Sequence, residues 1–121
     1  MTGTVSARLE AVVSVLLRSP DGHERPVECI VETGFDGELG PPAEEIERVG
    51  APFSHPDSAR FADGSVQEVD VSEVDLRWDG ERMTVYAEAL ADPLLGTRRL
   101  ARHRLTTEFA SGGAVTIRPL A

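Results

Sequence analysis

The chain has 121 residues, of which 40% are hydrophobic and 27% are charged, and its formal net charge is −9 at pH 7. This size and composition predict one folded domain over residues 1–121, with a modest core and no disordered part. The negative charge argues against nucleic acid as a partner, because phosphate binding relies on a basic surface. The longest apolar stretch, Ala11 to Leu17, is too short to cross a bilayer, and no secretory signal is visible. We therefore expect a soluble, cytoplasmic domain with no membrane partner.

Strand signals dominate the first part of the chain. Residues Leu9 to Leu17 are rich in valine and leucine, Pro20-Asp21-Gly22 supplies turn residues, and a second apolar run extends from Val27 to Val31. This order predicts a β-hairpin. The only cysteine, Cys29, lies in the second run and has no partner for an internal disulfide, so we expect it to be a small buried hydrophobe.

A short helix is predicted next. Pro41 and Pro42 precede Ala43–Val49, acids occupy the first turn, and Gly50 follows the last turn. This is the arrangement that helix ends favour. The segment from Ala51 to Ala59 is rich in proline and serine, which predicts a loop.

A long antiparallel pair follows. Over residues 65–78, valine, leucine and tryptophan alternate with mostly acidic residues, and Asp79-Gly80 predicts a tight turn into Met83–Ala89. The alternation slips at Glu68 and at Ser72-Glu73, which indicates a bulge or a bend.

The last part of the chain predicts a second helix and a closing hairpin. Thr97–His103 has a threonine that can cap its start and basic residues toward its end. Leu105–Phe109 and Ala114–Ile117 are predicted as two more strands, joined as a hairpin by Ser111-Gly112-Gly113. The expected fold class is therefore all-β with one or two short helices.

Four segments in chain order form a pattern. They are Glu32-Thr33-Gly34-Phe35-Asp36-Gly37, Phe61-Ala62-Asp63-Gly64-Ser65, Asp92-Pro93-Leu94-Leu95-Gly96 and residues 113–120. Together they resemble the retropepsin-like family of aspartic proteases, whose small bacterial members carry Asp-Thr-Gly-Phe-Asp-Gly in the first segment. The resemblance covers residues 9–120. It implies a closed β-barrel or sandwich that forms half of a two-fold homodimer, with the terminal strand at the dimer interface.

The resemblance also implies an activity and a role for each segment. The activity is that of an aspartic endopeptidase, in which two carboxylates, one from each copy, share a proton and activate a water against a peptide bond. The catalytic motif is Glu32, Thr33 and Gly34. The flap that covers a peptide or protein substrate is Phe61, Ala62, Asp63 and Gly64. The support behind the catalytic loop is Leu94, Leu95 and Gly96. No cofactor is implied.

One departure from the family pattern bears on the activity. The family has aspartate where this chain has Glu32. The extra methylene moves the carboxylate by about 1.5 Å, one carbon–carbon bond, and a misplacement of about 1 Å can cost on the order of a hundredfold in rate. The alternative is therefore a catalytically weak or inactive pseudoprotease that binds peptides as a dimer, and a third reading is a purely structural interaction module.

The remaining polar residues carry weaker signals. Asp36 precedes Gly37, where an aspartate commonly bonds to its own turn. The three histidines and Cys29 lack the spacing of metal ligands, so we propose no metal site. The basic run over residues 98–104 is typical of a solvated helix end, although an acidic partner would also fit it.

Overall fold

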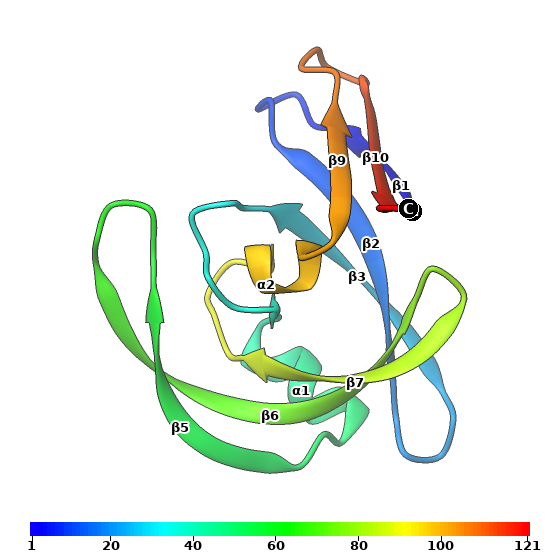
Figure 1. The fold of residues 1–121 in the computed structure, drawn as a ribbon. Helices are drawn as coiled ribbons and strands as arrows, with labels where there is room; N and C mark the ends of the chain where they lie inside the picture. The colour runs from blue at the N-terminus through cyan, green and yellow to red at the C-terminus, as the bar shows by residue number, and fades with distance from the viewer.

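The computed structural model describes all 121 residues and is mostly β, with ten strands and two short helices (Figure 1). The strands are β1 (Thr2–Val5), β2 (Ala11–Arg18), β3 (Glu24–Val31), β4 (Leu39–Gly40), β5 (Phe53–Arg60), β6 (Val66–Trp78), β7 (Glu81–Glu88), β8 (Leu94–Leu95), β9 (His103–Thr107) and β10 (Ala114–Pro119). The helices are α1 (Ala43–Val49) and α2 (Thr97–Leu100). The expected all-β class is confirmed at this level. None of the helices is long and apolar enough to cross a membrane.

All strands belong to one sheet that curls over itself. Its order is β5-β6-β7-β4-β8-β3-β2-β1-β10-β9, and β6 additionally pairs with the end of β2. A core of 17 buried residues fills the interior, drawn mainly from the inward faces of β2, β6 and β7. Every second side chain of these strands points into the core, because successive side chains of a strand point to opposite faces of the sheet. Cys29 belongs to this core, as predicted, and burial raises the pKa of its thiol to about 12.

The short strand β8 lies between β3 and β4. It runs parallel to β3 and antiparallel to β4, while β4 pairs in parallel with β7. The chain segment that joins β3 to β4 is residues 32–38, so β8 fixes both ends of that loop. This local topology positions the first of the sequence motifs.

A second, smaller hydrophobic cluster lies beneath the β5–β6 hairpin. Its buried members are Phe35, Ala59, Val69, Val71 and Leu90. Phe35 belongs to the loop over residues 32–38, so the cluster joins the hairpin to that loop. Because this cluster is separate from the main core, the hairpin and the loop depend on each other for burial.

Several predicted elements are confirmed. The hairpin formed by β2 and β3 turns over residues 19–23, and β6 pairs with β7 along its second half. Asp79 and Gly80 both have positive φ, 51° and 85°, as a tight hairpin turn of this kind requires. The helix over Ala43–Val49 has its predicted bounds, and Gly50 ends it with φ 68°.

The predicted loop over Ala51 to Ala59 is wrong, because most of it is the strand β5. This strand lies at the sheet edge and is almost fully exposed, so it lacks an apolar stripe. Pro56 is tolerated there, since an edge strand leaves one row of amides unpaired. The irregularity expected near Ser72 occurs on the partner strand, where the register shifts between Phe53 and His55. The strand β1 was not predicted at all.

The predicted helix over Thr97–His103 is too long. α2 ends at Leu100, Arg102 adopts φ 63°, and β9 begins at His103. The residue at the cap position is Gly96, and Thr97 instead donates its hydroxyl to the carbonyl of Phe35 at 3.3 Å. The capping role expected for Thr97 is therefore wrong.

The terminal strand does not lie at a free edge of the chain. β10 pairs with β1 on one side and with β9 on the other. Val115 and Ile117 of this strand are buried in the main core. Within one chain the free edge strand at this end is β9.

Candidate functional site

Glu32 is the first residue after β3 and opens the loop over residues 32–38. Its backbone N–H donates to the carbonyl of Leu95 at 2.9 Å. Its side chain bends back over the loop, where Oε1 accepts a hydrogen bond of 2.8 Å from the backbone N–H of Gly34. Glu32 is half-buried and Thr33 is exposed. The loop thus presents one carboxylate, with its second oxygen free of protein hydrogen bonds.

The segment that follows β8 holds this loop from behind. The backbone N–H groups of Gly96, Thr97 and Arg98 donate to the carbonyls of Glu38, Phe35 and Gly37 at 3.0, 3.0 and 3.1 Å. A Cβ atom at Gly96 would lie 2.2 Å from the Gly37 carbonyl oxygen, so only glycine allows this close approach. The structure therefore places Leu94, Leu95 and Gly96 against the loop that carries Glu32.

The tip of the β5–β6 hairpin lies beside the same loop, to its left in Figure 1. A Cβ atom at Gly34 would lie 2.2 Å from the Cβ of Ala62, so the two segments touch. Phe61 stacks on Phe35 with ring centroids 6.1 Å apart. Gly64 turns the tip with φ 84°, and Asp63 accepts a 2.8 Å hydrogen bond from the N–H of Ser65. Hydrogen bonding with the Ser65 side chain, and then with this N–H, lowers the pKa of Asp63.

The structure thus brings together three of the predicted segments. Glu32, Thr33 and Gly34 lie between the hairpin tip, formed by Phe61, Ala62, Asp63 and Gly64, and the support formed by Leu94, Leu95 and Gly96.

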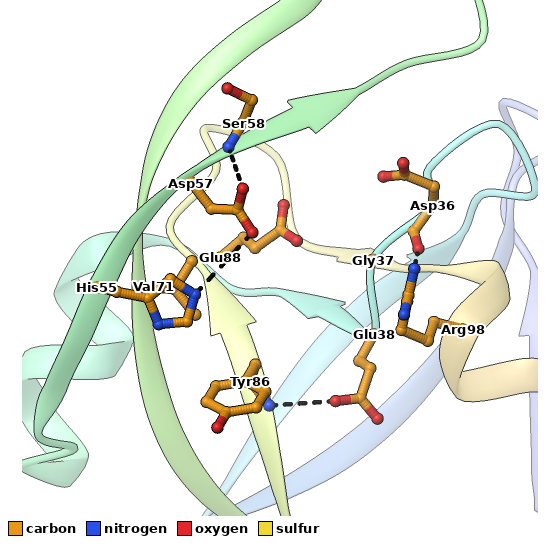
Figure 2. A pocket seen from close by; sticks show the side chains of 10 residues that line it. All are labelled: Asp36, Gly37, Glu38, His55, Asp57, Ser58, Val71, Tyr86, Glu88 and Arg98. Atoms are coloured by element: carbon orange, nitrogen blue, oxygen red, sulfur yellow. Dashed lines mark hydrogen bonds and ion pairs between the residues drawn. The ribbon is translucent and has the colours of Figure 1, made fainter.

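Beside this loop, a cavity of about 310 Å³ opens between the β5–β6 hairpin and residues 36–38 (Figure 2). Asp57 and Ser58 of β5 line one side, and Asp36 and Arg98 lie across from them. The other lining residues are Gly37, Glu38, His55, Val71, Tyr86 and Glu88.

Glu88 is the most perturbed carboxyl group of this cavity. Burial, and after it the charges of Asp36 and Asp57, raise its pKa to about 7 against the opposing effect of Arg98. Its Oε2 atom is buried and has no hydrogen-bond partner. The cavity therefore concentrates negative charge beyond what its own cations neutralise.

Another acidic residue of the cavity, Glu38, has partners within the chain. Its carboxylate accepts a hydrogen bond from the Tyr86 N–H at 3.2 Å and lies 3.7 Å from the Arg99 guanidinium. Arg99 in turn lies over the Trp78 ring, 4.9 Å from its centroid. Glu38 thus ties the end of the loop to β7 and α2.

Sequence reasoning missed most of the cavity. The role expected for Asp36, a bond to its own turn, is wrong, because its carboxylate makes no such hydrogen bond and only its carbonyl accepts one, from Arg98 at 3.4 Å. Asp57 falls in the segment predicted as a loop. Glu88 ends a strand with nothing in the local sequence to mark it. No group of three or more histidine, cysteine, aspartate or glutamate side chains converges as a metal ion would require.

A scan against protein-family models, a search of curated proteins and a search of solved structures found no match to this chain.

Proposed function

We propose that this chain is half of a retropepsin-like aspartic endopeptidase, and that a second copy completes the site by supplying its own Glu32. The observation that carries the proposal is the placement of Glu32. It opens a loop that β8 and the segment after it hold by backbone hydrogen bonds and that the tip of the β5–β6 hairpin contacts. Such a hairpin can enclose an extended peptide over the carboxylate, with water as the nucleophile.

The chemistry requires a pair of carboxylates. Two carboxylates brought close together cannot both ionise, so they share one proton, and one acts as general base toward water while the other acts as general acid. Each chain contributes one such loop, and a two-fold axis through the Glu32 loops brings the two together. The proposed activity therefore requires dimerisation.

A specific contact favours the alternative function, a pseudoprotease that binds peptides without cutting them. The extra methylene of Glu32 lets its carboxylate curl back to the Gly34 N–H of its own loop. A carboxylate engaged in this way points less directly at a partner across the axis. On this reading the flap and the loop form a peptide groove that has no competent acid–base pair.

The test compares three proteins that differ only at residue 32. Wild type, Glu32→Gln and Glu32→Asp are incubated with a peptide library at mildly acidic pH, and products are identified by mass spectrometry. We expect cleavage by wild type, none by Glu32→Gln, and a rate for Glu32→Asp that is higher by about tenfold or more, because a shorter side chain restores the alignment that the loop favours.

The other outcomes are equally informative. Activity only in Glu32→Asp would establish the pseudoprotease. Equal cleavage by wild type and Glu32→Gln would assign the chemistry to other residues and would contradict the proposal.

A further inference from the structure

The only tryptophan of the chain, Trp78, is hydrogen-bonded to a histidine. Trp78 ends β6 and is buried, with an exposed fraction of 4%. Its indole Nε1–H donates to Nε2 of His103, the first residue of β9, at 3.2 Å. The two rings meet edge to face, with their centroids 5.6 Å apart. One pair of side chains thus connects the end of β6 to the junction of α2 and β9.

The two hydrogen-bond partners of His103 fix the position of its proton. Its Nδ1 lies 2.8 Å from the carbonyl oxygen of Ala101, which can only accept a hydrogen bond, whereas the Trp78 indole can only donate one. Nδ1 therefore carries the hydrogen, Nε2 accepts, and the imidazole is neutral. In the imidazolium both ring nitrogens are donors. Protonation of Nε2 would set two N–H groups against each other and leave the buried indole donor without an acceptor, which is costly.

Protonation gives His103 no ion pair in exchange. The other two histidines each lie within 4.0 Å of an aspartate carboxylate, whereas His103 pairs with none. Arg99 already lies over the Trp78 ring, and Asp79 pairs with the N-terminal ammonium group at 3.5 Å. The charged residues on the elements around His103 are Arg99 of α2, Arg102, Arg104, Arg118 of β10, and Asp79 and Glu81 at the β6–β7 turn.

The segment that precedes His103 is weakly buried. The helix α2, which leads into β9 in Figure 1, has four residues, and none of them is fully buried. Arg102 adopts φ 63°, in the left-handed region that residues other than glycine rarely occupy. Segments with little burial open at a low cost in free energy. Loss of the Trp78 hydrogen bond therefore acts on a part of the chain that opens readily.

We propose that Trp78 and His103 form a pH-sensitive latch. Neutral His103 holds the junction of α2 and β9 against the end of β6, and protonation of His103 releases residues 97–104. Histidine is the side chain that changes its charge between about pH 5 and 8, so the latch opens in mildly acidic conditions. Residues 97 and 98 also hold the loop over residues 32–38 by their backbone N–H groups, so the latch connects pH to the support of that loop. The latch involves neither Glu32 nor a second copy, and it is therefore independent of the proposed function.

Tryptophan fluorescence reports on the latch directly, because Trp78 is its only source. Emission is recorded from pH 8 to pH 5 for wild type, His103→Gln and His23→Gln. We expect one transition in the wild type, since a protonated imidazole in contact with an indole quenches its emission. His103→Gln should show none, because its amide oxygen accepts from the indole but does not titrate. His23→Gln changes an exposed histidine between β2 and β3 and should keep the transition.

Hydrogen exchange measures the release itself. Protection factors, which are corrected for the pH dependence of chemical exchange, are compared at pH 8 and pH 5 for residues 97–104 and for β2. We expect wild type to lose protection about tenfold over residues 97–104 at pH 5 and to keep it in β2. His103→Gln should show no such loss. Trp78→Phe, which keeps an aromatic ring but has no N–H, should show equal protection at both pH values, and it tests the latch even where His103→Gln folds poorly.

Four outcomes would overturn the latch. They are a wild type without a fluorescence transition, a transition that persists in His103→Gln, a transition without loss of protection over residues 97–104, and a loss that extends equally to β2. The second outcome would assign the titration to another group, and the last would show a general loss of stability in place of a local release.

Discussion

Glu32 is the residue at which the two proposed functions differ. Its backbone is fixed by β8 through Leu95, whereas its side chain reaches the N–H of Gly34 in its own loop. The backbone geometry therefore favours the proposed endopeptidase, and the side-chain geometry favours the peptide-binding pseudoprotease. Substitution at this single residue separates the two readings because everything around it stays the same.

Glu88 gives a residue-scale prediction about stability. Its pKa is raised to about 7 in the folded protein, chiefly by burial, against an ordinary value of 4.5. A carboxyl group with a raised folded pKa penalises folding when ionised, so its penalty grows as pH rises from about 4.5 to about 7. We expect Glu88→Gln to be more stable than wild type at pH 8 and to show no gain at pH 4. Because the side chain is partly exposed, solvent screening reduces the gain to about 1 kcal/mol.

Urea unfolding at the two pH values measures this difference. Glu47→Gln, which replaces an exposed glutamate on α1, serves as the matched control and should show no pH-dependent gain. A gain for Glu88→Gln that is equal at both pH values would contradict the assigned pKa shift.

At the scale of elements, the β5–β6 hairpin depends on the small cluster beneath it. Phe61 at its tip stacks on the buried Phe35, while Phe53 near its base is 61% exposed. We expect Phe61→Ala to loosen the tip, because it removes an aromatic pair and its buried area, and to speed hydrogen exchange at Gly64 by about tenfold. Phe53→Ala is the matched control and should leave that exchange rate unchanged. Equal protection in both variants would show that the aromatic stack does not hold the hairpin closed.

The elements that the sequence predicts well are those with a local signal. Gly50 requires the left-handed conformation that ends α1, and Asp79-Gly80 suits the turn between β6 and β7. The missed strand β5 has no such signal, since its exposed edge position needs no apolar stripe. The second helix was predicted too long for another reason. His103 pairs with β10 as the first residue of β9, so it is not available to the helix.

The candidate site likewise has a part that local sequence motifs mark and a part that they do not mark. Glu32, the hairpin tip and the support segment are contiguous motifs, so the sequence shows them. The cavity beside them is assembled by tertiary contacts among β5, β7 and the loop, from single residues such as Asp57 and Glu88. Single acids on separate strands give no pattern, so only the fold reveals that they meet.

At the scale of the whole molecule, the proposal requires self-association. Thr33 is exposed, and its side chain makes no hydrogen bond within the chain. In the proposed dimer, Thr33 would hydrogen-bond across the two-fold axis to brace the two loops. We expect wild type to sediment as a dimer at micromolar concentration and Thr33→Ala to weaken the dimer by about tenfold, as the loss of paired hydrogen bonds at both copies implies.

The free energy of unfolding of the separated chain should not change in Thr33→Ala, because the side chain is exposed and no intrachain hydrogen bond is lost. Thr106→Ala, which alters an exposed threonine on β9, is the control. A strictly monomeric wild type would contradict the dimeric site altogether.

The central claim is that two copies of Glu32 form one active site, and a subunit-mixing measurement tests it most directly. Wild type and Glu32→Gln are unfolded together in varying ratios and refolded, and peptide cleavage is measured at constant total protein. If both carboxylates are required, activity follows the square of the wild-type fraction, so an equal mixture retains about a quarter of the full rate. A linear dependence, with about half the rate in the equal mixture, would place a complete site within each chain and would contradict the account.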